Sequence, residues 1–268
     1  MVNVMKVVYL GYLIPFADSL HANPRVTELI LGYEPKLPKG VKLYEYFKDS
    51  HIEIIDATNV NMNHEIINAC READIVVVGA FSQILKSSII DHCRGKILNF
   101  HPSKLPAYRG GHPIEHQLLD GVEEGGVTFH HIDNGVDSGS IIFQDSFPIS
   151  CRMTYESFLK TAINVGRELL EQVVAIGPGN WPQVSVSIKG DYRRILHAKD
   201  AVISPNMTVI QAKRIINALG WRGWVTYRGK DEIQNISRLL NSNIKHNVPN
   251  KELSLSDGKI TVEVANNE

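Results

Sequence analysis

Short apolar runs alternate with helical segments through the first part of the chain, and this alternation limits the folds that the sequence can adopt. Residues 63–71 and 83–93 carry the hydrophobic period of a helix, whereas residues 32–40 hold two prolines and two glycines and predict a loop. Apolar strands that alternate with helices predict an α/β fold with a Rossmann-like, mostly parallel sheet covered on both faces. The runs expected to form these strands lie at residues 6–11, 26–31, 51–55, 75–78 and 97–101.

The Gly-Pro-Gly-Asn-Trp-Pro run at residues 177–182 predicts a boundary between two domains near residue 178. Before it, we expect strands at 127–132 and 140–147 and a long helix at 154–176, which ends at a Gly-Pro-Gly run. After it, we expect a helix at 207–219, capped by Asn206, and a small set of strands. These strands are predicted at 224–227, 232–236 and 253–264, with a turn at Asp257-Gly258. The sequence therefore predicts a main domain at 1–178 and a small C-terminal helix plus β subdomain at 179–268.

Charge and cysteine content exclude several classes of protein. The chain has 268 residues, a formal net charge of -1 and three cysteines. Because the net charge is close to zero, the chain as a whole has no positive field that would attract nucleic acid. The cysteines are widely spaced and odd in number, which argues against a disulfide framework or a zinc site. No apolar stretch approaches the roughly 20 residues that a membrane span needs, and the first residues lack the features of a signal peptide. We therefore expect a soluble, cytoplasmic protein without a metal site.

Two polar segments are candidates for chemistry. Asn99 and His101 lie two residues apart at the end of an apolar run, so both side chains point to one face of the strand. Asp137 follows in a Val-Asp-Ser-Gly segment. Open α/β sheets bind ligands at the carboxyl ends of their strands. An amide, an imidazole and a carboxylate thus lie in one predicted α/β domain, each close to the end of a strand, although each type taken alone is more often a turn former or a satisfied polar residue.

The order and spacing of these segments resemble a known family. The chain reads Asn-Phe-His-Pro-Ser-Lys-Leu-Pro-Ala-Tyr-Arg-Gly from residue 99 and Asp-Ser-Gly from residue 137. In both segments it is similar to the formyltransferases that use 10-formyltetrahydrofolate, and most similar to those that act on nucleotide sugars. The likeness covers roughly residues 6–149 and implies the same α/β fold that the periodicity predicts. By position, Asn99, His101 and Asp137 match the catalytic residues of that family.

The resemblance also implies where 10-formyltetrahydrofolate binds as a cosubstrate. One group of residues lines the pterin pocket or packs beside it, and a second group lies in a loop whose backbone contacts the pterin ring. The first group is Phe81, Gln83, Ile84 and Leu85, and the second is His130, Ile132, Asp133 and Asn134. The resemblance implies neither a metal nor a covalent enzyme intermediate.

Formyl transfer gives the three catalytic candidates defined tasks. An amine attacks the formyl carbon, and an amide donor from Asn99 can stabilise the charge on the carbonyl oxygen by ~3 kcal/mol. His101 can donate when protonated or take the amine proton, since its ordinary pKa is about 6.5. Asp137 can accept from His101 or from an ordered water. The sequence leaves open which group removes the amine proton.

The acceptor is predicted from the resemblance and from the short C-terminal part. Residues 180–268 are shorter than the basic barrel of the methionyl-tRNA enzymes and longer than any extension of the purine-pathway enzymes. This implies a nucleotide-linked amino sugar, foremost a dTDP-amino-dideoxyhexose for a surface polysaccharide such as an O-antigen, and a homodimer. The candidate acceptor-binding residues are Tyr12, Lys104, Tyr108, Arg109, Trp221 and Trp224. Trp224 and Tyr227 are also readable as core residues of a small sheet.

Two other functions stay open. The chain could be a methionyl-tRNA formyltransferase, whose affinity for tRNA would fall steeply with added salt. It could also be a folate- or sugar-binding homologue without activity, against which the intact catalytic candidates argue. Further histidines near the predicted site match no zinc spacing. They are His112, His116, His130 and His131.

Overall fold

Two compact units make up the fold, and each is described by itself. The computed structural model describes residues 4–185, 192–229, 233–240 and 248–264. The first unit consists of residues 1–109, 126–146 and 162–191, and the second of residues 110–125, 147–161 and 192–268. These units are defined by packing, and both take residues from either side of residue 178. The division into domains at that residue remains a prediction.

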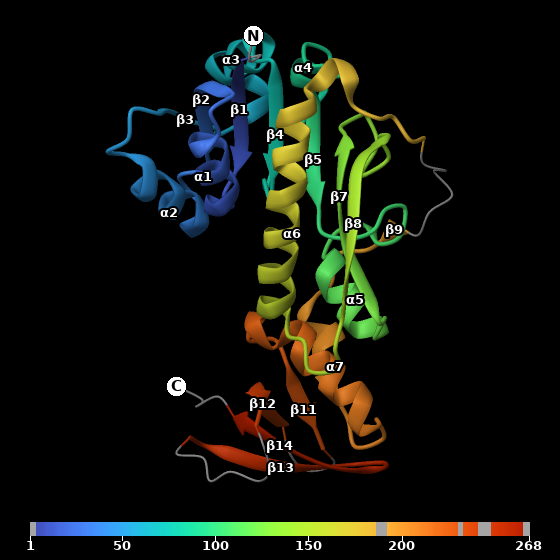
Figure 1. The fold of residues 1–268 in the computed structure, drawn as a ribbon. Helices are drawn as coiled ribbons and strands as arrows, with labels where there is room; N and C mark the ends of the chain where they lie inside the picture. Colours follow the sequence, from blue (N-terminus) through green and yellow to red (C-terminus); the bar gives the residue numbers. More distant parts are fainter. Residues whose placement is uncertain (1–3, 186–191, 230–232, 241–247, 265–268) are drawn as a thin grey trace. The chain divides into compact units, whose positions relative to one another are not determined.

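A seven-stranded sheet forms the centre of the first unit, in the order β3-β2-β1-β4-β5-β7-β8 (Figure 1). All pairings from β3 through β5 are parallel, and β7 runs antiparallel to β5. The parallel strands carry continuous apolar runs because helices bury both of their sides. This confirms the predicted mostly parallel α/β fold. The strands are β1 Met5–Gly11, β2 Val26–Tyr33, β3 Glu53–Asp56, β4 Ile75–Gly79, β5 Ile97–His101, β7 Glu124–His131 and β8 Ile141–Pro148.

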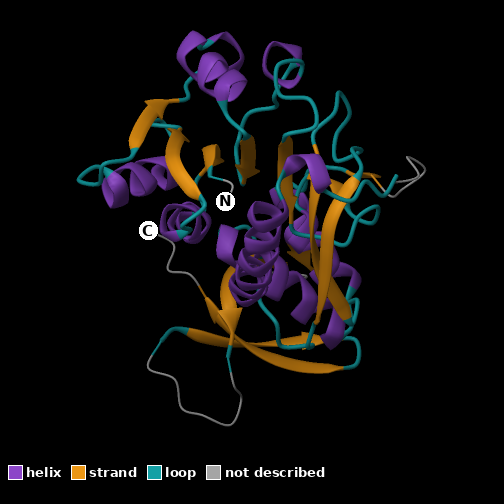
Figure 2. Ribbon diagram, turned by 45° about the horizontal axis from the view of Figure 1, so that its top comes forward, coloured by secondary structure: helices purple, strands orange, loops and turns teal. Residues whose placement is uncertain are grey.

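Helices cover both faces of this sheet (Figure 2). On one face, α3 (His64–Glu72) and α4 (Ser87–Ile90) join the apolar side chains of the strands in a core cluster. On the other face lie α1 (Ile14–Ala22) and α6 (Tyr155–Ile176).

The packing of α6 on β5 is especially close. A Cβ atom on Gly166 of α6 would stand 2.5 Å from the ring of Phe100 in β5. The same ring meets Phe16 of α1 edge-on, with centroids 4.7 Å apart. The strand that carries Asn99 and His101 is therefore braced by two helices.

The second unit combines α5 (Pro113–Asp120) and α7 (Val209–Leu219) with a five-stranded sheet, in the order β10-β11-β12-β14-β13. Leu255 pairs with Gly258 across the predicted hairpin turn. The helix and sheet expected in the C-terminal part are found here. The strands are β10 Val202–Ile203, β11 Thr226–Arg228, β12 Ile233–Leu239, β13 Asn250–Leu255 and β14 Gly258–Val264.

Some elements differ from those predicted. Helix α2 (Pro38–Phe47) begins inside the segment expected to be a loop, because Pro38 stands in the first helical turn, where no partner for its nitrogen is needed. The helix expected at 83–93 is only the four residues of α4. Thr208, not Asn206, caps α7 through a capping box with Gln211. Helices α1 and α5 were not predicted.

None of the helices in the part of the chain described is long and apolar enough to cross a membrane. The remaining elements of the fold are short. These elements are η1 Val60–Met62, β6 Arg109–Gly110, η2 Pro178–Asn180, β9 Tyr192–Arg193, η3 Ala198–Ala201 and η4 Gly220–Arg222.

Candidate active site

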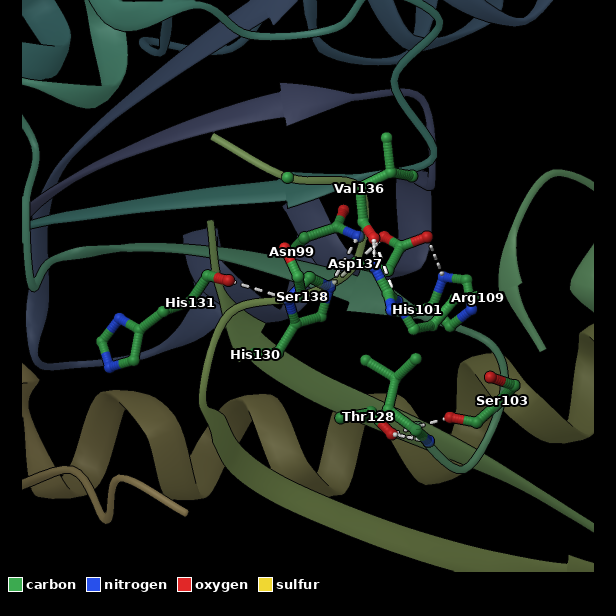
Figure 3. A network of polar contacts seen from close by, with 12 residues as sticks. Asn99, His101, Ser103, Arg109, Thr128, His130, His131, Val136, Asp137 and Ser138 are labelled. Atoms are coloured by element: carbon green, nitrogen blue, oxygen red, sulfur yellow. Dashed lines mark hydrogen bonds and ion pairs between the residues drawn. The ribbon is translucent and has the colours of Figure 1, made fainter. Parts of the chain in front are cut away.

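The carboxyl end of β5 and the facing part of β7 bring the candidate residues together (Figure 3). Asn99 lies opposite His130 in the antiparallel pairing, and His101 lies opposite Thr128. Side chains two residues apart on a strand share a face, and so do residues directly opposite each other on paired strands. Asn99, His101 and His130 therefore meet on one face at the edge of the sheet, with Asp137 beside them.

His101 has the geometry of a neutral base beside a carboxylate. Its Nε2 lies 2.9 Å from the backbone oxygen of Tyr108, and because a carbonyl only accepts, Nε2 carries the hydrogen. Its Nδ1 lies 3.6 Å from Oδ2 of Asp137. Burial lowers the pKa of His101 below its ordinary value of 6.5, although the carboxylate of Asp137 opposes this shift. The neutral ring therefore presents the lone pair of Nδ1 toward Asp137.

His130 links Asn99 to the same carboxylate. Its Nδ1 donates to the backbone oxygen of His131 at 2.8 Å, and its Nε2 is an acceptor because the amide nitrogen that faces it can only donate. The amide nitrogen of Asn99 donates to this Nε2 at 3.2 Å. Oδ1 of Asp137 lies 3.6 Å from the same atom. Asn99, His130, Asp137 and His101 thus form one continuous line of polar contacts.

The loop that carries Asp137 is fixed from its N-terminal side. Arg109, which is 7% exposed, donates from Nε and Nη2 to the backbone oxygen of Val136, at 3.2 and 2.8 Å. Asp137 itself has a φ of 49°, a left-handed conformation that costs a non-glycine residue roughly 1–2 kcal/mol. Such strain persists only where surrounding contacts hold it, and it is typical of functional sites.

A buried hydroxyl fixes the loop that follows β5. Thr128 is fully buried, and its Oγ1 donates to the backbone oxygen of Ser103 at 2.7 Å. The same oxygen accepts from the backbone nitrogen of Leu105 at 3.1 Å and from Nε2 of Gln144 at 2.8 Å. Neither Thr128 nor Gln144 was among the site residues predicted from the sequence. The only signal for Thr128 is its place opposite His101, and that requires the register of two antiparallel strands.

A Thr128→Val variant is expected to lower the free energy of unfolding by about 2–4 kcal/mol, because a methyl group of similar shape leaves buried polar partners unpaired. Urea unfolding followed by circular dichroism measures this loss. The control is Thr161→Val, since the hydroxyl of Thr161 bonds within its own helix, to the backbone oxygen of Ser157. Equal losses in the two variants would count against the special role of Thr128.

The lowered pKa of His101 also predicts how stability depends on pH. A histidine whose pKa is lower in the folded state takes up a proton on unfolding. Its stabilising contribution is complete above the unfolded value of 6.5 and is lost as the pH falls from there toward the folded pKa. A His101→Gln variant is therefore expected to lose less stability between neutral and mildly acidic pH than the wild type. Urea unfolding across this range tests the difference in slope, with His64→Gln, on the exposed start of α3, as the matched control.

The predicted folate-binding residues lie in the segment between β4 and α4, and at the end of β7 and in the loop that follows it. Phe81 and Ile132 pack against the core cluster, and Leu85 belongs to it. Ile84, in contrast, is 75% exposed. Asn134 is also exposed. The binding roles of these residues remain predictions.

The polar members of this group are engaged within the protein. Nε2 of Gln83 donates to Oε1 of Glu34 and to the backbone oxygen of Ala57, at 3.0 and 2.9 Å. Oδ1 of Asp133 accepts from the backbone nitrogen of Gly135 and from Oγ of Ser138, at 2.9 and 2.6 Å. Gln83 and Asp133 therefore shape their loops, and any contact with folate would come in addition.

The predicted acceptor-binding residues fall into both units. In the first unit, Lys104 is exposed and Tyr12 and Tyr108 are partly buried, while the guanidinium of Arg109 holds Val136. In the second, Trp221 lines a groove of about 1360 Å³ that residues of this unit form.

The Trp-rich segment of the second unit is organised around an ion pair. Arg222 lies over the rings of Trp221 and Trp224, at 4.3 and 4.6 Å from their centroids. Its Nη2 donates to Oε1 of the buried Glu115 at 2.6 Å. Trp221 also stacks on Tyr155, with centroids 4.2 Å apart. These contacts account for the segment by packing, and a role in binding the acceptor remains a prediction.

Two of the further histidines named from the sequence bond to backbone groups of the second unit. His116 Nε2 donates to the backbone oxygen of Arg194 at 2.9 Å, and Nδ1 of His112 accepts from the backbone nitrogen of Leu196 at 3.0 Å. Across the described ranges, no group of three or more His, Cys, Asp or Glu side chains is arranged to hold a metal ion.

Sequence comparison relates the chain to formyl transferases. Residues 44–174 match the family model described as formyl transferase. The chain is 32% identical over 184 residues to the methionyl-tRNA formyltransferase of Lachnospira eligens, covering 65% of this chain and 58% of that protein. It is 27% identical over 182 residues to the enzyme of the same name from Syntrophomonas wolfei, covering 63% and 57%. The matches thus span less than two thirds of the length of these relatives.

Structural comparison extends over nearly the whole chain. WlaRD, a sugar 3N-formyl transferase crystallised in the presence of dTDP and 5-N-formyl-THF, superposes with a TM-score of 0.69 at 21% identity, covering 99% of both chains. The N-formyltransferase from Helicobacter canadensis, in complex with folinic acid and dTDP-3-aminofucose, gives 0.69 at 18% identity, covering 98% of this chain and 99% of that one. At these identities the likeness shows a shared fold.

Proposed function

Because residues 44–174 place this chain in the formyl transferase family, we propose that it transfers a formyl group from 10-formyltetrahydrofolate to the amine of a nucleotide-linked amino sugar. The observation that carries the proposal is the line of contacts formed by Asn99, His130, Asp137 and His101. It provides an amide donor, a neutral imidazole and a carboxylate on one face of the sheet edge. Direct transfer of a formyl group to an amine can use all three, because the amide can stabilise the carbonyl oxygen and the imidazole can take the amine proton.

His101 is the group that we assign to the amine proton. Its Nε2 hydrogen is held by the backbone oxygen of Tyr108, so the proton can only be taken up at Nδ1. The imidazolium that results lies beside Oδ2 of Asp137, at 3.6 Å, and the carboxylate stabilises this charge. Because His101 is neutral in the resting site, it is ready to act as a base near neutral pH.

Asn99 is assigned to the formyl oxygen. One hydrogen of its amide nitrogen bonds to Nε2 of His130, which fixes the orientation of the side chain. The amide nitrogen carries a second hydrogen, which can stabilise negative charge on an oxygen in the site. A donor whose direction is fixed before the reaction stabilises the transition state most.

Two loops of the first unit are proposed to hold the folate. 10-Formyltetrahydrofolate carries the formyl group on N10, the nitrogen that links the pterin methylene group to the aminobenzoyl ring. When an amine attacks the formyl carbon, the bond from that carbon to N10 breaks, and tetrahydrofolate leaves with N10 taking the proton that the amine gives up. Ile84 offers an exposed apolar side chain, which suits a flat aromatic ring, and the loop from His130 to Asn134 begins beside Asn99. The proteins compared above support this cosubstrate, since one was crystallised with 5-N-formyl-THF and the other with folinic acid.

An Asp137→Asn variant is expected to lower kcat by about 10²-fold or more, because the imidazolium of His101 loses its carboxylate. Asparagine tolerates the left-handed backbone of residue 137, so the loop keeps its shape. Steady-state kinetics measures the effect, and Asp145→Asn, at an exposed position of β8, serves as the control. An Asp137→Asn enzyme with wild-type kcat would refute this assignment.

The acceptor is the less constrained part of the proposal. Full-length superposition on two sugar N-formyltransferases, against partial matches to methionyl-tRNA enzymes, favours an amino sugar. We propose that the acceptor is a dTDP-linked amino-dideoxyhexose and that its formylated product enters a surface polysaccharide. We further propose that the enzyme acts as a homodimer in the cytoplasm.

Methionyl-tRNA formylation is the second candidate, because the curated relatives carry that name. Binding of tRNA and binding of a nucleotide sugar differ in how strongly they depend on salt concentration. Binding of tRNA weakens steeply with salt, since each phosphate contact releases counterions, whereas a nucleotide sugar makes few such contacts. If the KM for the acceptor rises about twofold or less between low and moderate salt, this result supports a nucleotide sugar as the acceptor.

A transfer assay tests the function directly. The protein is incubated with 10-formyltetrahydrofolate and, separately, with dTDP-linked amino sugars that differ in amine position, a UDP-linked amino sugar and methionyl-tRNA. Mass spectrometry then detects the gain of one formyl group. Formylation of a nucleotide sugar is the expected result. Formylation of methionyl-tRNA alone would establish the second candidate, and no product at all would leave only a binding role.

A further inference from the structure

One exposed apolar residue in the first unit lies in a loop that hydrogen bonds fix on both sides of it. Ile84 lies in the segment between β4 and α4, here called the 80–86 loop, and is 75% exposed. It does not contribute to the core cluster, in contrast to Leu85 next to it. Hydrogen bonds nevertheless fix the loop on both sides of Ile84.

Glu34 fixes the N-terminal half of the loop. This residue follows β2 and is 7% exposed. Its Oε2 accepts from the backbone nitrogen of Ser82 at 3.1 Å, and its Oε1 accepts from the hydroxyl of Ser82 and from Nε2 of Gln83, the latter at 3.0 Å. One buried carboxylate thus satisfies three donors of the loop.

The backbone of Glu34 is itself fixed by α2. A Cβ atom at Gly40 would stand 2.1 Å from the backbone oxygen of Glu34, so only glycine permits this approach. The backbone nitrogen of Leu37 donates to the same oxygen at 3.1 Å. Glu34 is therefore a rigid anchor.

Asn61, from η1, fixes the C-terminal half. Its Nδ2 donates to the backbone oxygen of Ile84 at 2.9 Å, and its Oδ1 accepts from the backbone nitrogen of Lys86 at 2.7 Å. The oxygen of its own backbone accepts from the hydroxyl of Ser88 at 2.9 Å. The two anchors enclose Ile84 and leave its side chain outside the core.

We propose that Glu34 is a positioning residue for the folate: by holding Ser82 and Gln83 it sets the 80–86 loop so that Ile84 forms a preformed apolar contact for the pterin ring. This inference rests on the proposed function. A loop ordered before binding loses less conformational entropy when the ligand arrives, which raises affinity. Glu34 acts through the loop and has no part in the chemistry.

Binding of 5-formyltetrahydrofolate, followed by intrinsic fluorescence, tests this inference without turnover. Glu34→Ala removes the anchor, and Ser82→Ala removes one donor while the carboxylate stays in place. Each is expected to raise the Kd, by about 10-fold or more for Glu34→Ala, while kcat at saturating folate stays within about twofold. Glu34→Gln keeps an acceptor and is expected to restore part of the affinity. Glu53→Ala, at an exposed position of β3, is the control.

A double-mutant cycle shows whether Glu34 acts through Ile84. If it does, the combined Glu34→Ala and Ile84→Ala protein binds folate about as weakly as Ile84→Ala alone. Additive effects, or a lowered Tm with unchanged Kd, would mean that Glu34 only stabilises the fold and would overturn the inference. Wild-type protein that binds no folate would refute the proposed function together with it, whereas wild-type binding with an unaffected Glu34→Ala refutes the inference alone.

Discussion

A His101→Gln variant is expected to transfer formyl groups about 10²- to 10⁴-fold more slowly than the wild type. In the wild type, the backbone oxygen of Tyr108 accepts from Nε2 of His101, and glutamine at this position can still donate to that oxygen. It offers no base at the position of Nδ1, beside Asp137. The loss should therefore appear in kcat, while the Kd for folate stays within about threefold.

The matched control for this substitution is His64→Gln, at the exposed N-terminus of α3. The pH profile adds a second readout. The wild-type profile should show an acid limb below pH 6.5, since burial lowers the pKa of His101 from that value, and the variant should lack this limb. A variant with nearly full kcat would show that another group takes the amine proton.

An Asn99→Ala variant is expected to lose ~3 kcal/mol of transition-state stabilisation, or roughly 10²- to 10³-fold in kcat. The amide of Asn99 is fixed by its hydrogen bond to His130, at 3.2 Å, so its direction is set before substrate arrives. Alanine removes the donor and leaves Nε2 of His130 without that partner. Steady-state kinetics measures the loss of the donor in the transition state, and folate binding shows whether the change at His130 also disturbs the binding site.

The expected result for Asn99→Ala is a large fall in kcat with little change in folate affinity. Asn68→Ala, at an exposed position of α3, is the control and should behave as wild type. If Asn99→Ala instead weakens folate binding and spares kcat, the amide is a binding group, and the role assigned to it at the formyl oxygen is wrong.

The parts of the site that follow from local periodicity could be predicted from the sequence. Asn99 and His101 share a face because they lie two residues apart on a strand, and β5 has the predicted bounds of 97–101. Asp137 was linked to them only through the resemblance. The structure places it 3.6 Å from His101.

Contacts between distant segments could not be predicted. His130 was selected for the backbone of its loop, but its side chain bonds to Asn99 because the antiparallel register of β5 and β7 sets them opposite each other. Arg109 was expected at the acceptor, and its guanidinium donates to the backbone of Val136. Glu34 carried no signal in the sequence, since its donors lie almost fifty residues away in Ser82 and Gln83.

The fate of a labelled formyl group shows whether this site transfers the group to an amine. The protein is supplied with 10-formyltetrahydrofolate that carries carbon-13 in its formyl group, together with the amino-sugar nucleotide that the transfer assay identifies, and NMR follows the label. With wild type, the label should appear as the formamide carbon of the sugar, and with His101→Gln this signal should build up at least about 10²-fold more slowly. Label that appears as free formate, or equally fast formamide formation by both proteins, would contradict formyl transfer by this site.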